Sequence, residues 1–464
     1  MKLIIFFSLF PFLIFSQVQI GSDINGEASG DRIGDSVSLS SDGSIIAIGS
    51  AFVNEQAGQV QVYENQSGVW IQLGSDISDQ PPGEASGTSI SLSSDGNLVA
   101  IGTPFNTEDS GSVQVYEFQS NNWIQVGSDI IGESGDSNSG SSVSLSSNGT
   151  IIAIGAPGNE GFNNNNPGAG HVRVYEFQSN DWVQIGGDIN GEGLFYYSGS
   201  SVSLSSDGTI IAIGALGNNE VRIYEFQSNN WVQIGNPLIG ENVSLSSNGT
   251  IVATGSGGNS GYVKVYKNLS GTWTQIGNDI NGEAFGDQFG TSISLSSNGT
   301  IVAIGATEND GNGENSGHVK IYRNLAGTWT QIGNDINGEA SEDQFGTSIS
   351  LSSNGNIVIG SARFNDGNGE NSGHVRVFDL SQVLNFSSLS LSQFSLYPNP
   401  AQNQVTIQLQ EGLELNEATI YNTLGQFIST SKDKIINTSH LSSGMYLLEI
   451  ETNQGKATKQ FIVE

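Results

Sequence analysis

Two short segments of the chain place oxygen-bearing side chains at the regular spacing that suits a metal ion. Both segments read NDGNGENSGHV, and their acidic and amide residues are Asp310, Asn312 and Glu314 in one copy and Asp366, Asn368 and Glu370 in the other. Ca²⁺ prefers six to eight hard oxygen ligands, and alternating carboxylates and amides on a Gly-rich turn can wrap one ion. The bidentate acid that completes an EF-hand loop is missing, so an ordinary Gly/Asn turn is the other interpretation. The spacing predicts two candidate calcium sites, and no other cofactor is indicated.

A second set of carboxylates recurs in linkers that read Asp-Ile-x-Gly-Glu or a variant of it. The set is Glu27, Glu84, Glu133, Glu192, Glu283 and Glu339. If these side chains gather on one face, its negative potential attracts cations or a basic partner surface. The alternative is that they cap the Gly-rich linkers and keep the surface solvated. We interpret the set as a candidate binding face.

The remaining residues that could bind a ligand or take part in catalysis give weaker signals. His171, His318 and His374 are expected at strand ends in separate units, too far apart to share one metal ion. Each of six Trp residues is expected to pack against a neighbouring unit, with sugar stacking as the alternative. The sequence holds no G-x-S-x-G elbow, phosphate loop or dinucleotide fingerprint. We therefore predict that the protein is not an enzyme.

The composition narrows the classes of partner. The 464 residues include 14 Lys and Arg against 46 Asp and Glu, which gives a net charge of −32. Nucleic acid is excluded as a partner because phosphate binding needs clustered bases. The chain has no Cys, which excludes thiol catalysis, disulfides and Cys-based zinc sites. The 62 Gly residues suit short strands joined by tight turns.

The elements that position these residues come from an internal repeat. The motif G-x-x-[VI]-S-L-S-S-[DN]-G begins at Gly34, Gly87, Gly140, Gly199, Gly240, Gly290 and Gly346. Its Asp-Gly or Asn-Gly pair predicts a two-residue hairpin turn between VSLSS and the apolar segment that follows, such as 45–49. A third strand follows at 59–64, 171–176 and 318–323, and a fourth begins at Trp in W-x-Q-[ILV]-G. Four strands per repeat match the blade of a β-propeller.

The count of strands predicts how the array closes. Seven units have the first three strands, but only six have the Trp-led fourth strand, and the last unit ends after 374–379. Residues 17–21, QVQIG, resemble a fourth strand without its Trp. Pairing this segment with the last unit abolishes the open edges of the array. We predict an all-β chain in which 17–380 forms a seven-bladed β-propeller closed by an N-terminal strand.

The repeats resemble the FG-GAP repeats of integrin-type propellers. Phe289-Gly290 and Phe345-Gly346 supply FG, and residues 155–157 supply GAP. That family often carries an acidic calcium loop between the first two strands of a blade. Here the turn is Ser-Ser-Asp/Asn-Gly, so calcium is not expected at that position.

The two ends of the chain predict its destination. Residues 1–16 combine Lys2 with an apolar run that is too short to span a membrane, so they indicate a secretory signal peptide. Residues 394–464 resemble the C-terminal sorting domain of the type IX secretion system of Bacteroidetes, through Tyr397, Pro398, Asn399 and Pro400, residues 421–425, residues 441–446 and the KQFIV ending. The resemblance implies a small β-sandwich that the secretion machinery recognises, with residues 381–393 as a linker. We expect a secreted or outer-membrane surface protein without a transmembrane segment after signal cleavage.

These features favour a binding or adhesion module whose ligand is an unknown protein or glycan. All variation in loop length falls on one side of the predicted blades, which carries the loops between second and third strands and the linkers between blades. We name this the loop side. A glycan-binding lectin is the first alternative, and a surface polysaccharide hydrolase or lyase that uses the linker carboxylates is the second.

Overall fold

The computed structural model describes residues 17–78, 80–105, 110–133, 137–160, 167–385, 394–410, 412–422, 426–452 and 455–464. The predicted signal peptide, residues 386–393 of the predicted linker and residues 423–425 of the sorting motif lie outside this part. The chain divides into two compact units, Gln17–Leu380 and a second unit that includes Ser381–Glu464. Each unit is described by itself.

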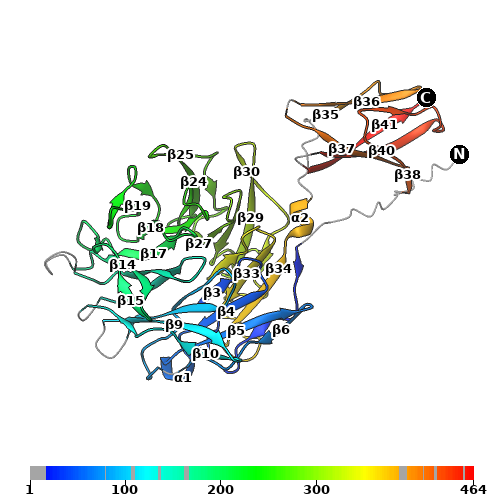
Figure 1. Cartoon of the computed structure of the whole chain (residues 1–464). Coiled ribbons are helices and arrows are strands. Elements are labelled where there is room, and N and C mark those ends of the chain that lie inside the picture. The colour runs from blue at the N-terminus through cyan, green and yellow to red at the C-terminus, as the bar shows by residue number, and fades with distance from the viewer. Residues whose placement is uncertain are drawn as a thin grey trace. The chain divides into compact units, whose positions relative to one another are not determined.

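Within its described residues, Gln17–Leu380 contains seven antiparallel sheets that follow one another along the chain (Figure 1). Their first strands are β3 (Ser36–Leu39), β7 (Ser89–Leu92), β12 (Ser142–Leu145), β17 (Ser198–Leu204), β22 (Asn242–Leu245), β27 (Phe289–Leu295) and β32 (Ile349–Leu351). Their second strands are β4 (Ile45–Ser50), β8 (Leu98–Thr103), β13 (Ile151–Ala156), β18 (Ile210–Ala215), β23 (Ile251–Ser256), β28 (Ile301–Ala306) and β33 (Ile357–Ala362). Their third strands are β5 (Gln59–Gln66), β9 (Ser112–Gln119), β14 (His171–Gln178), β19 (Glu220–Gln227), β24 (Tyr262–Leu269), β29 (His318–Leu325) and β34 (His374–Asp379).

Six of the described sheets end in a fourth strand that carries Trp. These strands are β6 (Val69–Gln72), β10 (Asn122–Gln125), β15 (Asp181–Gln184), β20 (Asn230–Gln233), β25 (Thr272–Gln275) and β30 (Thr328–Gln331). Short strands in the linkers pair with the start of a third strand; they are β11 (Ile130–Ile131), β16 (Ile189–Asn190), β21 (Leu238–Ile239), β26 (Ile280–Asn281) and β31 (Ile336–Asn337). The structure also has a short helix, α1 (Val53–Gln56), after β4.

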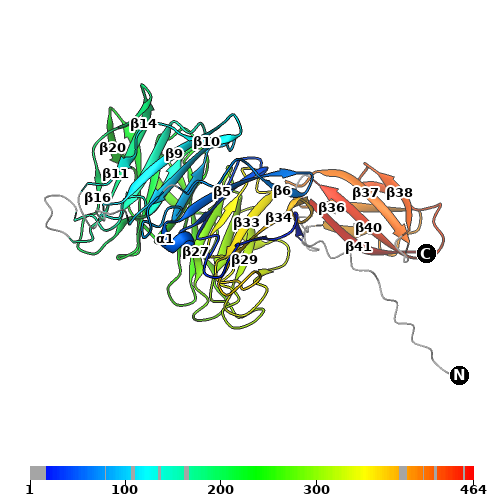
Figure 2. The ribbon, with the colours of Figure 1, turned by 90° about the horizontal axis from the view of Figure 1, so that it is seen from below.

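The N-terminal segment supplies the outer strand of the last sheet. β1 (Val18–Gln19) pairs with β34, with Val18 opposite Asp379, and β2 (Ile24–Asn25) pairs with the start of the same strand. The dark-blue start of the described chain accordingly lies beside β34 in Figures 1 and 2. Gln17 takes the place of Trp, because its side chain lies against Gly333 as each Trp lies against the equivalent glycine of a preceding sheet.

Backbone hydrogen bonds link the innermost strands to one another. The N–H of Ser41 donates to the carbonyl of Ser94, and the same bond recurs from sheet to sheet until the N–H of Ser353 donates to the carbonyl of Ser41. In a second series of hydrogen bonds, a serine Oγ on the first strand of one sheet accepts a backbone N–H from the first strand of the next sheet. Between the last and first sheets, the Oγ of Ser350 accepts the N–H of Leu39. The last sheet is therefore bonded to the first through their innermost strands.

Apolar clusters between successive sheets form the core of this unit. The second strands are buried at nearly every position, because both of their faces meet a neighbouring sheet. In the cluster between the last and first sheets, Ile359 and Val375 pack with Ile46 and Ile48. The Trp side chains lie at the outer end of these clusters, where Trp123, for example, donates a hydrogen bond of 2.8 Å to the carbonyl of Leu73 in the preceding sheet.

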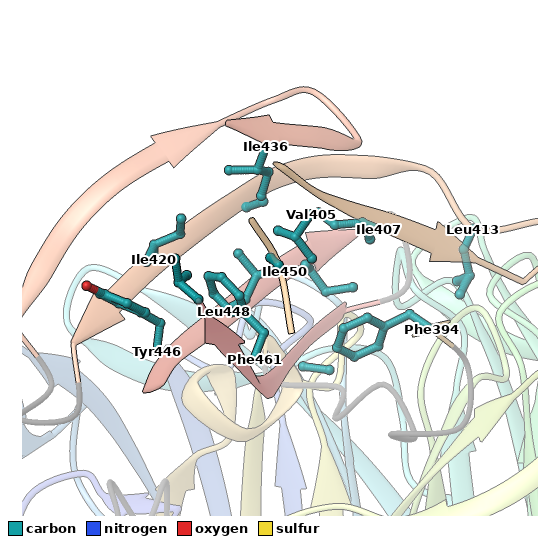
Figure 3. Packing of buried hydrophobic residues seen from close by; sticks show 14 residues of the cluster. Phe394, Val405, Ile407, Leu413, Ile420, Ile436, Tyr446, Leu448, Ile450 and Phe461 are labelled. Atoms are coloured by element: carbon teal, nitrogen blue, oxygen red, sulfur yellow. The ribbon is translucent and has the colours of Figure 1, made fainter. Parts of the chain in front are cut away.

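The unit that includes Ser381–Glu464 begins with the helix α2 (Ser381–Asn385) and continues as two antiparallel sheets. One sheet holds β35 (Phe394–Tyr397), β36 (Gln404–Leu409) and β39 (Ile435–Asn437), and the other holds β38 (Phe427–Ser431), β37 (Leu415–Asn422), β40 (Gly444–Thr452) and β41 (Gly455–Val463). Both sheets contribute to one apolar cluster, in which Figure 3 shows Val405 and Ile407 near Leu448, Ile450 and Phe461. The prediction of an all-β chain is confirmed, and in the described part no helix has the length and apolarity to cross a membrane.

Candidate functional site on the loop side

The predicted calcium loops fold as tight turns in which the candidate ligands already hold hydrogen bonds. Oδ1 of Asp310 accepts the N–H of Asn315 at 2.9 Å, and Oδ1 of Asp366 accepts the equivalent N–H of Asn371 at 2.7 Å. The amide of Asn312 donates to the carbonyl of Gly338, so it ties the loop to the following linker. Asn368 does the same to Gly26.

Further bonds fix the ends of these two loops. The carbonyls of Glu314 and Glu370 accept backbone N–H groups from Glu342 and Gly30. These contacts explain the NDGNGEN pattern, because its residues hydrogen-bond the loop to the linker that follows it around the array. They leave Oδ2 of each aspartate outside the turn bonds, and calcium binding stays a prediction.

Four linker glutamates form ion pairs with a base on the third strand of the following sheet. The pairs are Glu133 with Arg173, Glu192 with Arg222, Glu283 with Lys320 and Glu339 with Arg376. The side chains of the four bases are at most 15% exposed. An unpaired buried base is strongly destabilising, and these glutamates serve as charge partners. Arg173, Arg222 and Lys320 each have a second carboxylate partner, namely Asp188, Glu220 and Asp335.

The other two linker glutamates differ from this pattern. In the first two sheets the base is replaced by Gln61 and Gln114. Glu27 is exposed, whereas Glu84 is only 6% exposed. The six glutamates are therefore not equivalent in exposure, and the candidate binding face stays a prediction.

The three histidines are buried at the start of the third strands. Burial, reinforced by the nearby Arg173, lowers the pKa of His171 to about 4, and burial with Arg376 does the same for His374. Burial also lowers the pKa of His318, with Lys320 adding to the shift. All three imidazoles are therefore neutral near pH 7. Among the described residues, the two ring nitrogens of His374 have no hydrogen-bond partner.

Two structural carboxylates on this side were not recognised from the sequence. Asp287 is 5% exposed and Asp343 is 2% exposed. Oδ2 of Asp343 accepts the N–H groups of Glu339 and Ala340 and the amide of Asn365. The signal was present in the sequence as an Asp four residues after the linker Glu, in GEAFGD and GEASED.

An apolar patch on the loop side is the feature that best fits a binding surface. It consists of Leu194, Phe195, Tyr197 and Leu216, which are 53%, 54%, 37% and 57% exposed. The rings of Phe195 and Tyr197 lie 6.3 Å apart. The large exposed apolar side chains of the fourth strands, in contrast, lie at solvent-exposed strand positions, with two on β6 and one each on β10, β15 and β20.

Backbone hydrogen bonds hold this patch in place. The N–H of Phe195 donates to the carbonyl of Pro167, and the N–H of Gly217 donates to that of Tyr196. The N–H of Leu216 donates to Oγ of Ser200 at 3.2 Å. These bonds join three segments of the chain: the linker before β17, the loop after β13 and the loop after β18. The backbone that carries the exposed side chains is therefore fixed.

A polar cavity of about 280 Å³ lies between the innermost strands. Asp35, Asn242 and Thr347 are among the residues that line it. Burial raises the pKa of Asp35, although Arg363, whose Nη1 lies 3.6 Å from Oδ1 of Asp35, opposes the shift. Arg363 stacks on the ring of Phe364 at 4.8 Å. This cavity can admit a small polar group.

The sorting motif lies against the last strand of its own unit. β35 ends at Tyr397, which is 52% exposed, and Oδ1 of Asn399 accepts the N–H of Ile462 at 2.9 Å. The N–H of Ala401, the residue after Pro400, donates to the carbonyl of Ile462. The two sequence signatures, YPNP and KQFIV, therefore form one structural element.

Comparison with protein families gives matches in both units of the chain. The model of the secretion system C-terminal sorting domain matches residues 395–464, and the model of the FG-GAP repeat matches residues 281–322 and 337–378. The chain carries a type IX sorting domain. Both resemblances inferred from the sequence are confirmed, and the protein is exported to the cell surface or released from it. Among curated proteins, none matches this chain.

Proposed function

We propose that this exported protein is a binding module that attaches to a protein partner through its loop side. In this proposal the seven sheets are the blades of a closed propeller, and the sorting domain delivers the module to the cell surface. The observation that carries the proposal is the exposed patch of Leu194, Phe195, Tyr197 and Leu216 on a fixed backbone. Contiguous exposed apolar side chains of this kind mark interaction surfaces in soluble proteins.

The closed form of the propeller is supported by pairings from both ends of the repeat array. β1 pairs with β34. The N–H of Ser353, in the last sheet, donates to the carbonyl of Ser41, in the first sheet. Closure matters for function because it fixes the relative positions of all loops on the loop side. A rigid multi-loop surface loses little conformational entropy when it binds.

The glycan-binding alternative is less well supported by the outer Trp residues. In all six sheets that carry one, the indole N–H donates to a backbone carbonyl of the preceding sheet. These rings serve the contact between sheets. The hydrolase alternative relied on the linker carboxylates, and four of these pair with bases. We therefore propose that the module binds without catalysis.

The experiment is a binding assay of the labelled mature chain, residues 17–464, on intact cells of the producing bacterium. One sample of cells is treated with protease and another with periodate, which oxidises glycan diols. Saturable binding that protease abolishes and periodate spares supports the proposal. Binding that periodate abolishes and protease spares would contradict it in favour of a lectin, and the absence of saturable binding to untreated cells would contradict a role in adhesion to these cells.

A further inference from the structure

The seam at which the N-terminal segment joins the last sheet brings together three potential metal ligands. They are Asp23, which directly precedes β2, Glu339 in the linker after β31, and His374 at the start of β34. One ligand atom from each residue lies within 4.8 Å of the other two. Three segments that are distant in sequence therefore converge on one point.

The His374 side chain provides an independent sign that a ligand belongs there. It is 1% exposed, and within the part of the chain that the structure describes neither ring nitrogen has a hydrogen-bond partner. Buried polar atoms are nearly always satisfied, so an imidazole with two unpartnered nitrogens needs an explanation. Its Nδ1 lies 3.9 Å from Oε2 of Glu339.

From this arrangement we propose that Asp23, Glu339 and His374 form a site for a divalent transition metal, for which Zn²⁺ is the best match. Zn²⁺ accepts imidazole nitrogen and carboxylate oxygen at about 2.0–2.2 Å, and an open site has three protein ligands with water as the fourth. Tetrahedral ligands at such distances lie about 3.4 Å apart. The observed 3.9 Å between Nδ1 and Oε2 needs an adjustment of a few tenths of an ångström.

The charged neighbour Arg376 is compatible with this site. Its Nη1 lies 3.5 Å from Oε1 of Glu339, whereas Oε2 is the oxygen that faces His374. Its Nη2 donates to the carbonyl of Asn337, and its guanidinium stacks on Phe345 at 4.2 Å. Arg376 can thus stay paired with Oε1 of Glu339 and orient Oε2 toward the metal, as outer-shell partners of metal ligands commonly do.

The equivalent positions in other sheets show why this site is distinct. Glu133, His171 and Asp188 form a similar cluster, but the guanidinium of Arg173 bonds both oxygens of Asp188, at 2.8 and 3.1 Å. Oδ1 of Asp23 accepts the amide of Gln19 at 2.6 Å. Among the described residues, Oδ2 of Asp23 is in no hydrogen bond or ion pair, so it can turn toward a metal.

A metal at this point would join the N-terminal segment to the sheet that it completes. The pairing of that segment with β34 is short: two residues of β1 and two of β2 are in register, and Ile20 adds a backbone hydrogen bond to Val377. A bound ion would add a link among Asp23, Glu339 and His374, and would stabilise the closed form in proportion to its occupancy. This inference does not rest on the proposed binding function.

The test uses the full mature chain, which is stripped of metal with a chelator and then titrated with Zn²⁺. Millimolar Ca²⁺ and Mg²⁺ are present throughout to occupy surface carboxylates that bind cations without selectivity. Titration calorimetry is expected to show one strong site, and Zn²⁺ at 100 times its Kd is expected to raise the unfolding midpoint by about 3 °C. Co²⁺ in place of Zn²⁺ gives a visible absorption band that reports the coordination geometry.

The variants Asp23→Asn and Glu339→Gln are each expected to weaken Zn²⁺ binding at least tenfold. The matched controls are Asp188→Asn and Asp335→Asn, which change the equivalent carboxylates of other sheets and are expected to leave the strong site unchanged. Because Asp23 is partly exposed, its replacement is expected to preserve the metal-free unfolding midpoint, which separates loss of ligand from loss of fold. Absence of a strong site, or its loss in a control rather than in Asp23→Asn, would overturn the inference.

Discussion

An engineered disulfide between β1 and β34 provides a direct test of how the repeat array closes. The chain has no Cys, so Val18→Cys with Asp379→Cys introduces the only two thiols. The two residues are directly opposite in an antiparallel pair. Opposite residues in such pairs have Cα atoms about 4.5–5.5 Å apart, within the range of about 4.4–6.8 Å that a disulfide spans. Val18 is 53% exposed, so oxidant reaches it.

The expected stabilisation follows from the length of chain that the bond encloses. Residues 18 and 379 are separated by about 360 residues, and the chain-entropy relation gives a loss of about 20 cal/mol/K in the unfolded state. This corresponds to an upper value of about 6 kcal/mol at 25 °C, and strain reduces the measured gain below it. We expect rapid oxidation by mild oxidants, detected by intact mass, and a higher urea midpoint that reverts on reduction.

The control pairs Val18→Cys with Glu176→Cys, which is the position equivalent to Asp379 in the third sheet. This pair is expected to remain reduced at protein concentrations that prevent dimer formation. If the Val18–Asp379 pair stayed reduced under conditions that oxidise exposed thiols, or if the control formed an internal bond equally well, the closing role of β1 would be refuted.

Three further predictions concern the repeats and their loops. Trp123→Ala is expected to destabilise the protein by about 3–5 kcal/mol in urea unfolding, because the ring is 7% exposed and bonds to Leu73; a cost below about 1 kcal/mol would contradict its role between sheets. Replacing the three hairpin-turn aspartates with Asn, which the other four units already have, is expected to leave the thermal midpoint unchanged above pH 5 and to reduce its fall between about pH 4 and 2. The three carboxylates are Asp42, Asp95 and Asp207. Burial raises the pKa of each, but hydrogen bonds from their own turns outweigh it and hold each pKa below 3.8. The stabilisation from these carboxylates is therefore present above pH 3.8 and is lost as pH falls through the lowered pKa. Millimolar Ca²⁺ is expected to raise the unfolding midpoint, and Asp310→Ala with Asp366→Ala is expected to remove that rise; an equal rise in the variant would show that Ca²⁺ does not bind at these loops.

Local features of the sequence were sufficient to predict the elements of the repeat. The Asp-Gly and Asn-Gly pairs predicted hairpin turns with positive φ at glycine, and Gly43 and Gly355 have φ of 77° and 75°. The expected two-residue length is wrong, because Ser40 pairs with Ile45 and the first turn therefore comprises residues 41–44. The buried second strands followed from apolar residues at nearly every position. The pairing of β1 with the last unit followed from counting strands.

The chemistry of the loop side was harder to predict because it depends on contacts between sheets. Nothing local to Glu192 indicates that its partner is Arg222 on a third strand of the next sheet. The isolation of His374 likewise depends on which groups surround it after folding. The exposed patch at Phe195 could not be separated by sequence from an apolar segment that packs inward, since its exposure depends on the backbone bonds that hold the linker outward.

The measurement that most directly tests the central claim is the affinity of the mature chain for cells after the exposed patch is made polar. Leu194→Ser with Phe195→Ser is compared with the wild type and with Val69→Ser and Ile71→Ser, which remove exposed apolar area from a fourth strand. Removing two anchors of an interface is expected to weaken binding at least tenfold, whereas the control is expected to bind like the wild type. Equal affinity of all three chains would contradict binding through the loop-side patch.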